Sequence, residues 1–336
     1  MKGVIYMRHA RAIAAVFVSG GLSLSGAVDP ALLGLVPPGT KLVSGIQLDQ
    51  ARSSQFGRYL LNQIDTEDER FQQLTEETGF DPRRDLNEVL FATSGPGEVN
   101  TQPSFVVLAR GSFDQNRIEA KAKAKGAAVE TYQGVHLMLK ARENHHNSGV
   151  AFLDGGIAVL ADRATLRQIV AGRATPTVLD AALQDQVVKA SAANDAWFAS
   201  SMPGSYLTRH LEHETSQPMQ HAQALQSILQ SSGGVHFGDM VEFSLDASTR
   251  SPQDAVSLAD VLHFGASMVQ MQRQNDPRAA IVASAVDSMK ITSSGPTLHA
   301  TFSLTEKQLE ELVAAGRRAG VAVSVDPGRL PKPSKP

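Results

Sequence analysis

The chain has 336 residues, a mass of 35.8 kDa, a formal net charge of −3 at pH 7 and no cysteine. Without cysteine it cannot form disulfides, zinc–sulfur sites, iron–sulfur clusters or a lipid anchor on an N-terminal cysteine, and the near-neutral charge argues against an electrostatic nucleic-acid binder. The composition, 42% hydrophobic and 19% charged, is that of a globular protein, and the length predicts two domains.

The first 27 residues predict a cleaved signal peptide. Lys2, Arg8 and Arg11 form a basic start, residues 12–28 are uncharged, and the small residues at 25–27 fit cleavage before Val28. This uncharged run is shorter than the roughly 20 apolar residues of a membrane-spanning helix. Cleavage removes three basic and no acidic residues, which changes the formal net charge from −3 to −6. We therefore expect an exported protein, periplasmic or extracellular; the alternative is an inner-membrane anchor through residues 12–28.

The next segment, residues 28–175, predicts a first α+β domain. Strands are expected where apolar residues alternate between turn residues, and helices where they recur every three to four residues behind a capping residue. A turn at 154–156 between two short apolar runs predicts a hairpin. The expected elements are strand 42–49, a helix capped by Ser54, a helix from Thr66 to Gly79, strands 89–93 and 105–110, helix 114–124, strand 135–140, hairpin 150–161 and a helix capped by Asp162.

Residues 176–325 predict a second α+β domain, and the proline-rich residues 326–336 predict a disordered tail. Ser251 before a proline predicts the start of a long helix. The expected elements are a strand with Trp197 and Phe198, helical segments through Leu225, Ile228 and Leu229, a strand alternating Phe237, Val241, Phe243 and Leu245, the long helix, a hairpin at 289–302 and a last helix capped by Thr305 with Gln308.

Three segments of the first half match segments of the second in the order of their elements. Strand–turn–strand–helix at 150–171 matches 289–319, strand plus helix at 105–124 matches 241–262, and strand 42–49 matches 195–202. Similar offsets indicate a degenerate duplication, although such matches also arise by chance in α+β proteins. The predicted fold class is therefore α+β, with two related domains, each a mainly antiparallel sheet covered by helices.

Histidines are the first candidates for a hidden site. His210 and His213 lie three residues apart on an expected helix, and Glu212, Glu214 or His221 could add a third metal ligand. The spacing of four residues used by helical zinc-protease motifs is absent. A polar surface helix explains these residues without a metal, so the prediction is no metal site and no cofactor.

Other catalytic patterns are missing or have simpler explanations. The sequence has no Gly-x-Ser-x-Gly elbow, phosphate-binding lysine loop or dinucleotide fingerprint. The loop histidines His145 and His146 predict only adventitious metal binding, and the basic residues at 117–125 predict a solvated helix face because no aromatic residues alternate with them. Met240, Met268 and Met271 could line an adaptable groove, but they are expected to fill a core. No catalytic residue is assigned, and the chain is expected not to be an enzyme.

Three short segments carry a family resemblance: residues 37–40, Pro-Pro-Gly-Thr, before the first strand; residues 79–86, Gly-Phe-Asp-Pro-Arg-Arg-Asp-Leu; and residues 161–166, Ala-Asp-Arg-Ala-Thr-Leu, before a helix. In these segments the chain resembles uncharacterised exported bacterial proteins built from duplicated α+β units, a domain of unknown function. The resemblance implies location and architecture, and no catalytic residues.

These observations predict a non-catalytic envelope protein that binds a partner through a surface between two related domains. The expected partners are an envelope protein or a small ligand, with no nucleic acid and no stable membrane span after cleavage. Two alternatives stay open: an exported hydrolase with an unrecognised site, and a carrier of a metal or small ligand.

Overall fold

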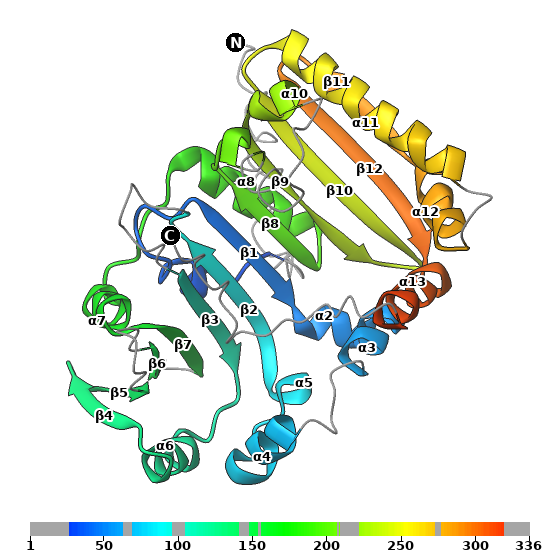
Figure 1. The fold of residues 1–336 in the computed structure, drawn as a ribbon. Coiled ribbons are helices and arrows are strands. Elements are labelled where there is room, and N and C mark those ends of the chain that lie inside the picture. The colour runs from blue at the N-terminus through cyan, green and yellow to red at the C-terminus, as the bar shows by residue number, and fades with distance from the viewer. Residues whose placement is uncertain are drawn as a thin grey trace, which may run out of the picture.

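A computed structural model describes residues 27–62, 69–95, 105–140, 148–153, 156–206, 208, 222–272 and 277–318. They form one antiparallel sheet of twelve strands with helices packed against it (Figure 1). The predicted α+β class and antiparallel pairing are confirmed. The signal peptide expected up to Ala27 lies, apart from that last residue, outside the described residues, as does the tail at 326–336.

The strands follow the order β11-β12-β10-β9-β8-β1-β2-β3-β7-β6-β5-β4, and every neighbouring pair is antiparallel. At the centre β1 pairs with β8, which joins strands from both sides of residue 175. The division into two related domains at that point stays a prediction. The strands are β1 (Leu42–Gln47), β2 (Leu86–Thr93), β3 (Phe105–Gly111), β4 (Ala128–Tyr132), β5 (Val135–Lys140), β6 (Ser148–Leu153), β7 (Ile157–Asp162), β8 (Ala196–Ser200), β9 (Ile228–Phe237), β10 (Met240–Thr249), β11 (Lys290–Ser294) and β12 (Thr297–Thr305).

The helices begin where the sequence supplies side-chain caps. Ser54 Oγ accepts a hydrogen bond from the Gly57 amide at 2.9 Å, and Asp162 accepts from two amides at 2.8 and 3.0 Å. The helices are α1 (Pro30–Leu33), α2 (Leu48–Ser53), α3 (Gln55–Asn62), α4 (Glu69–Thr78), α5 (Pro82–Asp85), α6 (Gln115–Ala124), α7 (Arg163–Gly172), α8 (Ala181–Ala193), α10 (Ala222–Gln226), α11 (Pro252–Gln272), α12 (Pro277–Asp287) and α13 (Glu306–Arg318).

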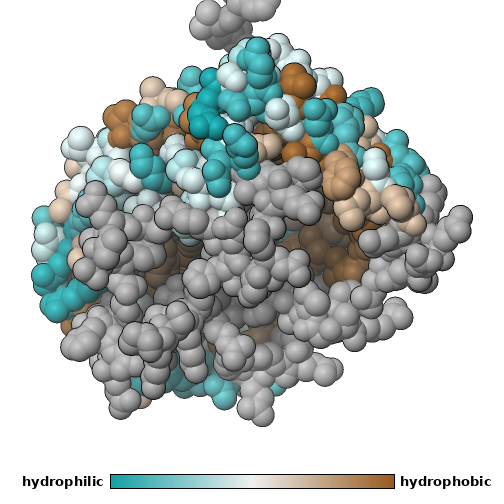
Figure 2. All heavy atoms as spheres, turned by 45° about the horizontal axis from the view of Figure 1, so that its top comes forward, coloured by the Kyte–Doolittle hydropathy of each residue, from teal (hydrophilic) through white to brown (hydrophobic). Residues whose placement is uncertain are grey.

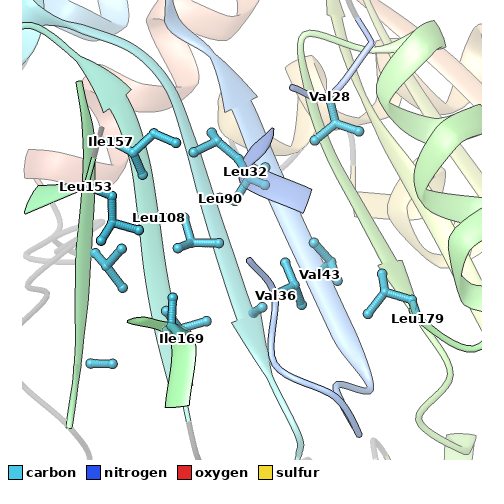
Figure 3. Packing of buried hydrophobic residues seen from close by; sticks show 14 of the residues in the cluster. Val28, Leu32, Val36, Val43, Leu90, Leu108, Leu153, Ile157, Ile169 and Leu179 are labelled. Atoms are coloured by element: carbon cyan, nitrogen blue, oxygen red, sulfur yellow. The ribbon is translucent and has the colours of Figure 1, made fainter. Parts of the chain in front are cut away.

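One core lies on the face of the sheet that packs against α1, α7 and α8, which we call the α8 face. Directly paired residues of antiparallel strands point to the same face, so Val43, Ala92 and Val106 lie together on β1, β2 and β3. Fully buried leucines of the helices, among them Leu32 and Leu183, close this core (Figure 3). The α8 face is thus the buried side of the sheet from β8 across to β5.

A second core lies on the opposite face, which we call the α11 face. Val241 of β10 and Leu304 of β12 are paired in register and are buried with Ala285 of α12, Leu309 of α13 and Phe56 of α3. A third cluster beside it places α11 on the same strands. Most of the helices therefore lie on different sides of the two halves of the sheet: α1, α7 and α8 pack on the α8 face, and α11, α12 and α13 pack on the α11 face. The shorter α6 lies on the α11 face beside β5 and β6.

Several sequence predictions are wrong in detail. The helix expected through Ile228 and Leu229 stops at Gln226, because Ile228 begins β9 and is buried against β10 and β12. The strand expected to run from Phe237 to Leu245 is two strands, β9 and β10. Strand β4 and helices α8 and α12 were not predicted at all.

The three methionines expected in a core are also placed differently, and Met240 at the start of β10 is 39% exposed. Met268 is 48% exposed and Met271 is 81% exposed, on the outer side of α11. The inner side of this helix is filled by Ala255 and Leu258 instead, which are buried.

Candidate functional site

A large apolar surface lies on the α11 face of β1, β2, β3, β6 and β7. Within the described residues, α1, α7 and α8 pack on the opposite face of these strands, and Phe152 at one end of the surface contacts Phe113. In Figure 1 no labelled helix lies in front of β1, β2 or β3. Its residues are half-buried, apart from Phe91, which is 37% exposed, and none belongs to any of the three buried clusters. We call this set the open apolar face: Leu42, Ser44, Ile46, Val89, Phe91, Thr93, Phe105, Val107, Ala109, Val150, Phe152, Ala158 and Leu160.

A groove of about 430 Å³ continues this surface toward the second half of the sheet. It lies between strands β8–β12 and the inner side of α11. The link is β8, since Ala196 and Phe198 line the groove and are paired with Ile46 and Ser44 of the open apolar face. The lining of this apolar groove is Ala196, Trp197, Phe198, Gly234, Val235, Phe243, Ser244, Leu245, Leu262, Met289, Ala300 and Phe302.

Together the open apolar face and the apolar groove carry no charged side chain. They cross the sheet from β12 to β6, which at about 4.8 Å between strands is roughly 38 Å. Figure 2 shows hydrophobic residues below an upper surface on which hydrophilic residues are frequent. Monomeric proteins rarely expose a contiguous apolar patch of more than a few hundred Å², so this surface is the strongest candidate for a site among the described residues.

A buried carboxyl group lies at the other side of the sheet, under the first described residues. Glu88 of β2 is 5% exposed, and its two oxygens accept from the Asp29 amide at 3.1 and 3.3 Å. Its neighbour in register, Gln47 of β1, donates to the Ala27 carbonyl at 3.3 Å. Burial raises the pKa of Glu88 to about 7, and the nearby Asp29 charge adds to this, against the backbone hydrogen bond and the Arg110 charge.

Asp29 is itself held by an ion pair. Both the Nε and an Nη of Arg110 donate to its carboxylate, at 2.8 and 2.6 Å, and its other oxygen caps α1. The buried carboxyl of Glu88 therefore lies beside a satisfied carboxylate and receives no ion pair in the described residues. We name Gln47, Glu88, Asp29 and Arg110 the Glu88 cluster.

The candidate metal ligands of the sequence lie outside the described part of the chain. His145, His146, His210, His213 and His221 lie outside the described residues, as do Glu212 and Glu214. Among the residues that are described, no three histidine, aspartate or glutamate side chains lie together as a metal site would require. The described histidines instead form single acidic pairs, such as His236 with Asp195 at 3.0 Å and His299 with Asp246 at 2.8 Å.

Basic residues outside these sites are used in local structure. Arg83 pairs with Asp81 and Arg84 with Asp85 in the segment before β2. Lys121 and Lys125 of α6 both pair with Glu77 of α4, which lowers the pKa of that carboxyl. These contacts fasten helices to one another.

No family model, curated protein or solved structure matches this chain. Within the described residues there is also no helix with the length and hydrophobicity needed to cross a membrane.

Sequence reasoning missed the open apolar face, although a signal for it was present. Residues 89–92, Val-Leu-Phe-Ala, and 105–109, Phe-Val-Val-Leu-Ala, are continuous apolar runs. An antiparallel strand with one face in water alternates apolar and polar residues, whereas a strand covered on both faces does not. Such runs in an antiparallel sheet indicate a second apolar face that some other group must cover.

Proposed function

We propose that the protein is a non-catalytic binding protein that holds a long acyl chain, such as that of a lipid or fatty acid, against its apolar surface. The observation that carries this proposal is the uncharged surface that continues from the open apolar face into the apolar groove. The groove volume of about 430 Å³ lies in the range of small-molecule sites. Each methylene of the acyl chain that is buried contributes roughly 0.8 kcal/mol to the binding free energy. The number of buried methylenes, not polar contacts, therefore determines the affinity.

The shape of the surface favours a flexible chain over a compact ligand. It is an apolar strip of roughly 38 Å, whose polar members are the small hydroxyls of Ser44, Thr93 and Ser244. A polar or charged ligand would leave its hydrogen-bonding groups unmatched there, which is costly. An extended acyl chain has no such groups.

The proposal includes export to the envelope through cleavage of the first 27 residues, and duplication of one α+β unit. The strand orders β1-β2-β3-β7-β6 and β8-β9-β10-β12-β11 run outward from the centre in the same sense, which supports the duplication. The segments matched in the sequence, β3 with β10 and β6-β7 with β11-β12, hold equivalent places in these orders.

The direct test is to purify the exported chain, extract it with organic solvent and identify bound lipids by mass spectrometry. A second measurement titrates the delipidated protein with cis-parinaric acid, a fluorescent fatty acid. We expect Phe91→Asp to weaken this binding at least about tenfold, because the guest would have to cover a carboxylate. Ala196→Phe, which fills the groove beside β8, is expected to weaken it as well.

The matched control is Thr292→Asp, which adds the same charge at an exposed position of β11. It should bind like the unaltered chain. Equal affinity of the Phe91→Asp variant and the control would refute the proposal. So would a stable dimer by light scattering that carries no lipid and falls apart in Phe91→Asp, since a second copy would then cover the surface.

A further inference from the structure

The expected cleavage point lies directly on the Glu88 cluster. The Ala27 carbonyl, which belongs to the peptide bond that would be cut, accepts from Gln47, and the next amide but one, that of Asp29, donates to Glu88. Because Gln47 and Glu88 are partners in the β1–β2 register, Val28 is held between these two contacts. The Val28 side chain is 6% exposed and belongs to the core of the α8 face.

We propose that Glu88 is the counter-ion of a new amino terminus at Val28, created when the Ala27–Val28 bond is hydrolysed during export. A signal peptidase adds one water to this bond: the carbon–nitrogen bond breaks, Ala27 leaves as a carboxylate on the leader, and the Val28 nitrogen takes up a proton. The ammonium group then lies beside a buried carboxylate that has no ion-pair partner of its own in the described residues. Hydrolysis of the peptide bond and protonation of the Val28 nitrogen involve no oxidation or reduction.

The cluster is built for a cation at this place. Asp29 is already neutralised by Arg110 with contacts of 2.6 and 2.8 Å, so Glu88 is the carboxylate left to receive one. An uncompensated buried charge is strongly destabilising, whereas a hydrogen-bonded pair is not. Processing thus converts a group that opposes folding at neutral pH into one that anchors the first residue of the mature chain.

The same geometry sets the order of events. With Val28 buried and the Ala27 carbonyl bonded to Gln47, the bond to be cut is held against the folded sheet. Cleavage must therefore precede the docking of residues 27–29. We expect a signal peptidase to cut the uncleaved chain when it is partly unfolded in urea, and not to cut it when it is folded.

The first test is the amino-terminal sequence of the protein recovered from the envelope of an exporting host. Val28 is the expected first residue, and a mature chain that begins elsewhere would overturn the proposal.

The second test compares two purified forms, one that begins at Val28 and one that keeps Gly26 and Ala27. Glu88→Gln is made in both, with Glu242→Gln, an exposed carboxylate on β10, as the control. At pH 7 we expect Glu88→Gln to reduce the folding equilibrium constant at least about tenfold in the Val28 form and not to reduce it in the longer form. The amine of Val28 should also titrate above the usual range of α-amino groups, and return to that range in Glu88→Gln.

Equal effects of Glu88→Gln in the two forms would refute the ion pair, as would an amine that titrates identically with and without Glu88. Glu88→Gln could prevent folding of the Val28 form altogether. If the longer form with the same substitution still folds, glutamine fits at position 88, and the result agrees with the proposal. The control substitution should change neither form.

Discussion

The Glu88 carboxyl predicts a specific dependence of stability on pH in any form of the chain that still carries Ala27. Its pKa is about 7 when folded, against an ordinary value of 4.5, because burial disfavours its charge. The folded carboxyl thus binds its proton more tightly than the unfolded one. Its contribution is fully present below pH 4.5 and is lost as pH rises through 7, a total of about 3 kcal/mol. Roughly 2.5 kcal/mol of this falls between pH 5 and pH 8.

The assay is urea unfolding at pH 5, 6, 7 and 8 of the form that begins at Gly26, with and without Glu88→Gln. Gln cannot ionise, so the variant should lose less stability than the unaltered chain as pH rises. The difference between the two curves removes the contribution of every other titrating group, because these groups are common to both forms. Parallel curves would refute the reasoning, because they would mean that Glu88 is solvated or paired in the folded chain.

Five further substitutions test the packing and the helix capping, two of them as matched controls. Leu183→Ala, at a fully buried position of α8, should cost about 2–5 kcal/mol in urea unfolding, whereas Val188→Ala on the exposed side of the same helix should cost little. Gly45→Ala would place a Cβ 2.6 Å from the Leu90 side chain and should destabilise by about 1–3 kcal/mol, while Gly265→Ala in α11 meets nothing within 4 Å and should stabilise by up to about 1 kcal/mol. Asp162→Ala removes the cap of α7 and should cost about 1 kcal/mol.

Local chemistry made much of the fold predictable. The caps at Ser54, Asp162 and Thr305 act through contacts within three residues, and each begins a helix in the structure as expected. The missed elements depend on distant partners. Helix α8 is held by leucine and valine side chains that pack on strands far away in the sequence, and Ile228 enters β9 because β10 and β12 bury it.

The candidate site was less predictable because pairing across the sheet creates it. The sequence does not show that β1 lies beside β8, and without that neighbour the open apolar face and the apolar groove are separate surfaces. The Glu88 cluster has the same origin: Glu88 is 59 residues from Asp29 in the sequence and meets it only because β2 lies beside β1 under the first residues. In the sequence Glu88 does not differ from the other glutamates of the chain; only its burial in the structure identifies it.

The two halves of the chain differ in the helices that lie on the α11 face. In the second half the strand β10 is followed by α11, 21 residues long, and by α12, and these two helices cover the α11 face of β10 and β12. In the equivalent place after β3 stands α6, which has 10 residues and lies near β5 and β6. Helix α6 is about 15 Å long, and the pocket that it lines is shared with residues of β5 and β6, not of β1, β2 or β3. If the halves descend from one unit, the first half has kept apolar side chains on the α11 face of β1, β2, β3 and β7, although its described helices cover that face less. This agrees with the proposed binding surface, since apolar strands without a covering group would favour aggregation.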